Sequence, residues 1–263
     1  MNDNIRNEIK LFTTGYQNER HTETIWRTPL VGFASALDPL FETLKEAVTP
    51  THAMPKDLLP DAHTVVAFFV PFEESTIRSN VEGEISSRNW AQAYLETNGL
   101  IVELGAYMKR YLESLGHAVT VTPPTHNFDP GVLISDWSHR HVAFVAGLGT
   151  FGLNNMLITH SGCCGRIGSF VTSANMAPDL RPETDACLYH YNASCIKCVK
   201  RCVNDALFVD RFDRHKCYEM CLRNEEIFRF LGRADVCGKC LVGVPCSSMN
   251  PVSKLYQDAE QDA

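Results

Sequence analysis

The chain has 263 residues, of which 44% are hydrophobic and 21% charged, as in ordinary soluble globular proteins. Its formal net charge of −7 argues against nonspecific binding to nucleic acid as the main task. No segment approaches the ~20 apolar residues of a membrane span, and residues 1–10 lack a signal-peptide core. We therefore expect a cytoplasmic protein with no membrane partner, whose eleven cysteines bind metal rather than form disulfides.

The part of the chain before residue 180 predicts a mixed α+β fold. Residues 64–70 form a β-branched and aromatic run that is typical of a buried strand. Leu100, Leu104 and Met108 recur at helical spacing, and Gly116 is placed to end their helix. In chain order we expect a strand over 64–70, a helix over 99–115, a strand over 119–121, a helix over 136–146 with Ser135 as N-cap, and short strands over 156–159 and 167–172.

A glycine-rich loop has the spacing G-x-G-x-x-G. It consists of Gly147, Leu148, Gly149, Thr150, Phe151 and Gly152. A dinucleotide fingerprint needs a strand before the loop and a helix after it, whereas the expected order here is helix and then strand. Two interpretations stay open: a helix-to-strand turn that needs positive φ, and a loop whose backbone approaches a planar cofactor.

The segment before this loop concentrates polar side chains. Asp136, Arg140 and His141 are the candidate catalytic residues, because they could donate a proton or hold an anionic group. The alternative is a capped helix with Trp137 in the core and a solvated polar face. Cys163 and Cys164 are adjacent, so they suit one iron poorly; they are expected to be one buried and one exposed thiol, or a thiol that faces a cofactor.

Nine of the eleven cysteines follow residue 180, which favours a boundary there between residues 1–180 and 181–263. Their spacing suits two 4Fe–4S clusters, each of which needs four thiolates. In two-cluster ferredoxins the last cysteine of one run binds the other cluster. Applied here, this rule gives set A, which is Cys187, Cys195, Cys198 and Cys246, and set B, which is Cys202, Cys217, Cys237 and Cys240.

Two alternatives concern the ligands. The two Cys-x2-Cys pairs also suit structural zinc, although Cys-x2-Cys-x3-Cys is a ferredoxin spacing. Asn192 stands where a ferredoxin run has a cysteine, so Cys187 has to reach its cluster from further away. Cys221 is left over, as a neighbour of Cys217 and a fallback ligand.

The residues around the loop resemble the epoxyqueuosine reductase family, to whose arrangement reductive dehalogenases are similar. The resemblance rests on Ala146–Asn154, on Leu157 and Ile158, on the helix that ends in Leu115-Gly116-His117, and on the cysteines, and it covers most of residues 50–250. It implies a nitroreductase-like corrinoid-binding domain over 1–180 and a ferredoxin-like domain with two 4Fe–4S clusters over 181–263. It also implies a cobalamin held at residues 147–152 and Asn154, with electrons passing from set B to set A.

The resemblance further implies an external electron donor such as a ferredoxin or flavodoxin. Glu96-Thr97-Asn98 and Leu133 stand where the family has an Asp-Tyr-His triplet and an acidic catalytic residue. With the net charge, these departures favour a small-molecule substrate over a transfer RNA, which is not ruled out. A non-catalytic corrinoid-handling or electron-carrier protein and a flavin-containing ferredoxin-type reductase remain the alternative functions.

Overall fold

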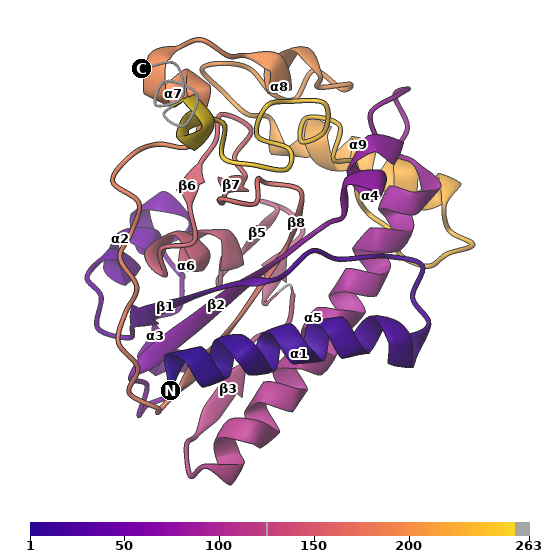
Figure 1. Ribbon diagram of the computed structural model, residues 1–263. Coiled ribbons are helices and arrows are strands. Elements are labelled where there is room, and N and C mark those ends of the chain that lie inside the picture. Colours follow the sequence, from indigo (N-terminus) through magenta and orange to yellow (C-terminus); the bar gives the residue numbers. More distant parts are fainter. Residues whose placement is uncertain (125, 256–263) are drawn as a thin grey trace, which may run out of the picture.

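A four-stranded antiparallel sheet, in the order β1-β2-β8-β3, forms the centre of the molecule. The computed structural model describes residues 1–124 and 126–255 (Figure 1). β2 (Thr64–Pro71) is buried along its whole length, because it pairs with β1 (Leu30–Ser35) and β8 (Gly165–Thr172) and is covered on both faces. The β-branched and aromatic run that predicted a strand here therefore does form the central strand.

Helices and short strands make up the rest of the regular structure. They are α1 (Asn2–Arg20), α2 (Leu40–Ala47), α3 (Pro55–Leu58), α4 (Glu74–Ser79), α5 (Arg88–Ser114), β3 (Val119–Val121), β4 (Phe128–Asp129), β5 (Ile134–Ser135), α6 (His139–Val145), β6 (Thr150–Phe151), β7 (Leu157–Ile158), α7 (Leu188–Asn192), α8 (Lys197–Lys200) and α9 (Arg214–Ile227). No helix in the described ranges is long and apolar enough to cross a membrane.

Successive side chains of β2 point to opposite faces of the sheet, and each face has its own hydrophobic cluster. Val66 and Phe68 lie with residues of α1 and α5 in one cluster. Val65 and Ala67 lie with residues of α2 and α6 in the other. The result is a sheet between two helical layers, so the predicted α+β class is confirmed.

Two helices begin at other residues than the sequence predicts. α5 begins at Arg88, far ahead of Gly99, where the Ser87 side chain accepts a hydrogen bond from the Trp90 amide. α6 begins at His139 after Ser138, and Ser135 belongs to β5 instead. The helix ends are as expected, since Gly116 and Gly147 both have positive φ.

The cysteine-rich part, residues 181–255 of the described chain, lies beyond one end of the sheet and contains the helices α7, α8 and α9 (Figure 1). It packs directly against the rest of the protein. One hydrophobic cluster combines Phe72, Trp90 and Ile158 with Cys187 and Leu241. A boundary near residue 180 therefore stays a prediction, and this shared cluster fixes where the cysteines sit relative to the sheet.

Candidate functional site

The four cysteines of set A come together around a small cavity. Cys187, Cys195, Cys198 and Cys246 line a space of about 20 Å³ with Leu153, Asn154 and Val244. Burial, and then the nearby thiols of Cys246, Cys187 and Cys195, raise the pKa of Cys198 to about 12. Cys187 reaches this cavity although Asn192 replaces the usual cysteine. It directly precedes the short helix α7, and Ala193 after that helix takes the left-handed conformation that turns the chain towards Cys195.

The four cysteines of set B line a much larger cavity of about 790 Å³. Burial, and then the thiols of Cys217, Cys237 and Cys202, raise the pKa of Cys240. Cys221 lies one helical turn after Cys217 on α9 and lines the same cavity, and its thiol is the main cause that lowers the pKa of Cys217. Each predicted set therefore lines one cavity, although no three His, Cys, Asp or Glu side chains of the described residues converge as a site for a single metal ion. What the two sets bind stays a prediction.

The part of the chain before residue 180, with the central sheet and its covering helices, is called the sheet domain below. The large cavity lies between it and the set B cysteines. α5 contributes Trp90, Tyr94 and Asn98, and β8 contributes Arg166. Two adjoining cavities of about 340 and 420 Å³ share Arg140 and Arg214 with it. The three cavities together form one hollow, which is large enough for a cofactor.

Unsatisfied polar atoms point to a ligand in this hollow. Within the described part of the chain, three buried side-chain nitrogen or oxygen atoms have no hydrogen-bond partner: Trp90 Nε1, Asn98 Oδ1 and Arg166 Nε. All three residues line the large cavity. Leaving such an atom unpaired costs about 1–3 kcal/mol. Their concentration at one cavity is typical of a ligand-binding site.

Tyr94 joins two charged groups at the wall of this cavity. Its hydroxyl donates to Asp235 Oδ1 over 2.6 Å, and the Arg166 guanidinium lies 4.3 Å from the centre of its ring. Burial is the largest of the effects that raise the pKa of Tyr94 to about 12. Tyr94 therefore keeps its proton at neutral pH, and an O–H donor lies beside a cation.

The three residues proposed to be catalytic are not all at the cavity. Arg140 lines all three spaces, and its Nη1 donates to the Asn155 carbonyl over 2.7 Å. His141 lines the two smaller spaces, and burial lowers its pKa to about 4, so its imidazole is neutral. Asp136 lines none of the three.

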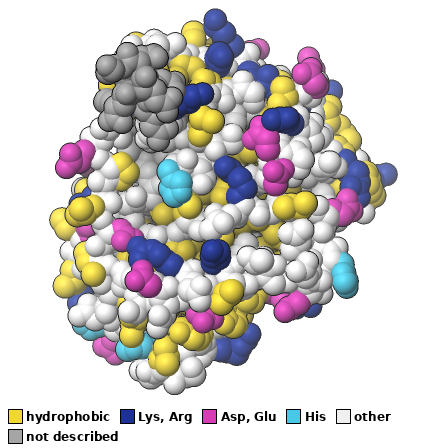
Figure 2. Space-filling view, in the orientation of Figure 1, with side chains coloured by type: hydrophobic (Ala, Val, Ile, Leu, Met, Phe, Trp, Pro, Cys, Tyr) yellow, Lys and Arg dark blue, Asp and Glu magenta, His cyan; other side chains and the backbone are white. Residues whose placement is uncertain are grey.

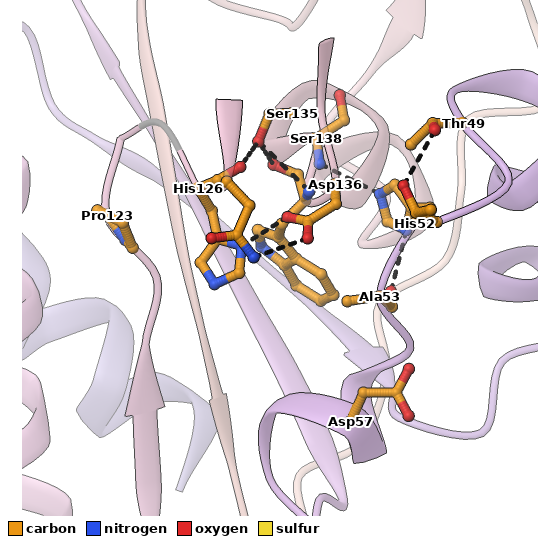
Figure 3. Close-up of polar contacts among 12 residues, drawn as sticks. Thr49, His52, Ala53, Asp57, Pro123, His126, Ser135, Asp136 and Ser138 are labelled. Carbon is orange, nitrogen blue, oxygen red and sulfur yellow. Dashed lines mark hydrogen bonds and ion pairs between the residues drawn. The ribbon is translucent and has the colours of Figure 1, made fainter. Parts of the chain in front are cut away.

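Asp136 instead takes part in a hydrogen-bond network away from the cavity (Figure 3). Its carboxylate is 2.6 Å from His126 Nδ1 and accepts from Asn127 Nδ2 over 2.9 Å. In the same region, His52 Nε2 accepts a hydrogen bond from the Ser138 amide. These contacts hold the loop before α6 in place, and they favour a structural role for Asp136.

Most of the predicted cofactor loop packs against protein. A Cβ on Gly147 would lie 2.7 Å from the Leu180 carbonyl oxygen, and one on Gly149 would lie 2.1 Å from that of Ile158. Phe151 and Gly152 line the cavity of about 420 Å³. Asn154 lines both the large cavity and the set A cavity. The glycines thus have a sufficient explanation in a tight turn, and of the predicted contacts Asn154 is the one placed at the large cavity.

Cys163 and Cys164 are both buried, so neither is the exposed thiol that the sequence suggested. The Cys164 thiol donates to the Leu241 carbonyl over 3.2 Å. The Cys163 amide donates to the Cys246 carbonyl over 2.9 Å, which places Cys163 directly behind set A. Both residues belong to the hydrophobic cluster that joins the sheet domain to the cysteine-rich part.

Sequence reasoning missed Trp90, Tyr94 and Arg166. The signal for the first two was present: Trp90, Tyr94 and Asn98 are spaced four apart and so share one face of a helix. It was not used because the predicted helix began at Gly99. Arg166 had no signal, since its position at the cavity depends on the pairing of β8 with β2.

Comparison with known proteins identifies solved structures that have the same fold. No protein-family profile matches the sequence, and no curated protein does. A solved epoxyqueuosine reductase, labelled with selenomethionine, matches with a TM-score of 0.56 at 18% identity over 92% of this chain and 66% of that one. The epoxyqueuosine reductase from Streptococcus thermophilus matches with a TM-score of 0.52 at 16% identity, over 92% and 69%. The chain shares the fold of these reductases.

Reductive dehalogenases have the same fold. One whose structure suggests a mechanism for B12-dependent dehalogenation matches with a TM-score of 0.56 at 17% identity, over 87% of this chain and 31% of that one. The chain thus spans about two thirds of the length of the epoxyqueuosine reductases and less than a third of that dehalogenase. The family resemblance seen in the sequence is confirmed at the level of fold.

Proposed function

We propose that the protein is an iron–sulfur reductase with one 4Fe–4S cluster at set A, a second at set B, and a corrinoid in the hollow that Arg140 and Arg214 line. A single observation carries the proposal. The thiols of set B, with that of Cys221, line the same large cavity as Asn98 Oδ1 and Arg166 Nε, two unpaired polar atoms of the sheet domain. An electron-transfer group and the site of a further ligand would therefore be in direct contact.

The residues present fit these groups. Each set supplies four thiols, which is the complement of one 4Fe–4S cluster. When bound, the clusters supply single electrons at low potential and a corrinoid supplies a cobalt centre for reduction of a substrate. The three adjoining cavities give room for a macrocycle, and epoxyqueuosine reductases and B12-dependent dehalogenases share the fold.

The side chains of the cavity have separate tasks in this proposal. Arg166, Arg140 and Arg214 hold anionic or hydrogen-bond-accepting groups of the bound molecules. Tyr94 holds a proton at its hydroxyl oxygen, and Asp235 orients that group by accepting its hydrogen bond. His141 is neutral and accepts or donates a hydrogen bond without adding charge.

The placement of the two sets favours an order of electron entry opposite to the one the sequence suggested. Set B lines the large cavity, and set A lies behind it, with Cys198 close enough to Cys240 for their thiols to interact. Lys197 and Lys200 are exposed on α8 next to Cys198, and Lys and Arg side chains gather where α8 lies (Figure 2). An acidic donor such as a ferredoxin or flavodoxin would meet the protein at α8.

Anaerobic reconstitution tests this function. Purified protein is given iron and sulfide, then either hydroxocobalamin or flavin mononucleotide, and the excess is removed by gel filtration. We expect about eight iron atoms per chain and a retained corrinoid spectrum. Zinc without iron would refute the clusters, and iron with flavin but no corrinoid would support the flavin-containing alternative. A protein that binds corrinoid but reduces no substrate would be the carrier.

A further inference from the structure

The three tryptophans differ in what their indole N–H groups contact. Trp26 Nε1 donates to Thr97 Oγ1 over 2.8 Å, and Trp137 Nε1 donates to Ser169 Oγ over 3.0 Å. Trp90 is only 2% exposed, yet its Nε1 has no hydrogen-bond partner among the described residues. Because a buried indole N–H normally finds an acceptor, its partner is expected to be a group that binds the protein.

The position of Trp90 indicates which group that is. A Cβ on Gly238 would lie 2.5 Å from Trp90 Nε1 and 2.4 Å from two carbons of the indole ring. Gly238, with φ of +73°, lies in the turn between Cys237 and Cys240. All four residues of this turn, 237–240, line the large cavity. The nitrogen edge of the indole therefore touches the turn that carries two thiols of set B.

The indole ring is held firmly in this orientation. Phe72 meets it edge to face, with ring centres 5.2 Å apart and planes at 86°. The Trp90 amide is the one that the Ser87 cap binds, so the residue belongs to the first turn of α5. A fixed donor of this kind loses little entropy when it forms a hydrogen bond.

We propose that the Trp90 indole N–H donates a hydrogen bond to a sulfur atom of the 4Fe–4S cluster at set B, and that this bond raises the reduction potential of that cluster. The inference rests on the proposed function, because it requires iron at set B. A hydrogen bond to sulfur stabilises the reduced cluster more than the oxidised one, since reduction adds negative charge. Trp90 would thus act on the potential through the cluster and would not touch the substrate.

The test compares Trp90→Phe with Trp26→Phe in the reconstituted full-length protein. Both variants lose an indole N–H and keep an aromatic ring, but Trp26 has its acceptor within the protein. Midpoint potentials are measured by redox titration followed by electron paramagnetic resonance. We expect Trp90→Phe to lower one of the two cluster potentials and leave the other unchanged, while Trp26→Phe changes neither. Two unchanged potentials in a Trp90→Phe protein that retains its iron would overturn the inference.

A second measurement needs no substitution. Protein labelled with 15N at the tryptophan indoles is reduced, and the cluster signal is examined for coupling to 15N. We expect a coupling that Trp26→Phe retains, whereas its absence in the wild-type protein would overturn the hydrogen bond even if Trp90→Phe fails to fold. Iron counting separates the two proposals: without iron at set B both fail, and with iron present only the role of Trp90 is in question.

Discussion

The sheet domain and the cysteine-rich part are stabilised in different ways. All eight residues of β2 are buried, and both faces of the sheet carry hydrophobic clusters. By contrast, α7 has no buried residue and α9 has only Met220 and Asn224. The loops of this part bury Leu207, Leu241 and Val244, but in small clusters that include residues of the sheet domain. Such a small core of its own offsets little of the entropy of ordering the chain. The comparison indicates that the first part folds around its own core, whereas the second depends on what its cysteines bind.

Removal of iron is expected to have the largest effect and to separate the two parts. Without clusters, we expect amide hydrogens of residues 195–240 to exchange rapidly while those of β2 and β8 stay protected, because only the former lose their cross-links. Hydrogen exchange read by mass spectrometry, with and without a chelator under anaerobic conditions, measures this. Equal protection of both parts in the iron-free protein would show that the cysteine-rich part has a sufficient core.

Single cysteine substitutions sharpen the comparison within the second part. Cys198→Ser is expected to remove the cluster of set A and Cys237→Ser that of set B, each lowering the iron content by about four atoms per chain. Cys221→Ser is the matched control, since Cys221 lines the cavity but belongs to neither set. Cys187→Ser tests whether Cys187 is a ligand of set A, in which case it lowers the iron content as much as Cys198→Ser does. If Cys221→Ser lost as much iron as Cys237→Ser, set B would be assigned wrongly.

The same contrast explains what could be predicted from the sequence. The buried run at β2 and the glycine caps follow from local chemistry, and so they were found. The cysteine sets followed from a spacing rule, and the structure places each set at one cavity, with Cys221 beside set B. The N-terminal end of α5 was missed, because Leu95, Glu96 and Thr97 continue the helix without adding to the clear apolar pattern that marked its later turns.

The large cavity could not be predicted, because it is assembled from distant parts of the chain. Arg166 lies on β8, Tyr94 on α5 and Asp235 after α9, and no local spacing relates them. The proposed catalytic residues were chosen for being near the glycine loop in sequence. Of these, the structure places Arg140 at the large cavity, whereas the Asp136 carboxylate contacts His126 and Asn127.

Acid is expected to weaken the sheet domain through His139. This imidazole is 8% exposed, its Nε2 lies 2.8 Å from the Pro123 carbonyl, and burial lowers its pKa from 6.5 to about 4. As the pH falls from 6.5 towards 4, the unfolded chain binds a proton that the folded protein does not. The contribution of neutral His139 to the free energy of unfolding is therefore complete above pH 6.5. It decreases by roughly 3 kcal/mol as the pH falls to 4.

Urea titrations of the protein between pH 4 and 7 give the free energy of unfolding and so measure this loss. His139→Asn should be less stable at pH 7 but should show a flatter pH dependence, because the titrating group is gone. His21→Asn, at an exposed position after α1, is the control and should keep the wild-type slope. An unchanged slope in His139→Asn would assign the acid sensitivity to other groups.

The smallest expected effect concerns Arg166, at the border of the two parts. Its guanidinium lies over Tyr94, and its Nε is buried without a partner. We expect Arg166→Gln to weaken cobalamin binding about tenfold, which corresponds to about 1.4 kcal/mol, since one charged donor to the ligand is lost. The measurement is a titration of reconstituted protein with cobalamin, and Arg229→Gln, on an exposed ion pair with Glu226, is the control.

Stability distinguishes a ligand-binding arginine from a structural one. Arg166 is half-buried and makes no ion pair among the described residues. Partial burial of an unpaired cation costs free energy in the folded protein, so its removal should leave the free energy of unfolding unchanged or slightly higher. Arg166→Gln would then lose affinity without losing stability. If unfolding became easier while cobalamin binding stayed the same, Arg166 would serve the packing around Tyr94 and the hollow would belong to a ligand that does not reach β8.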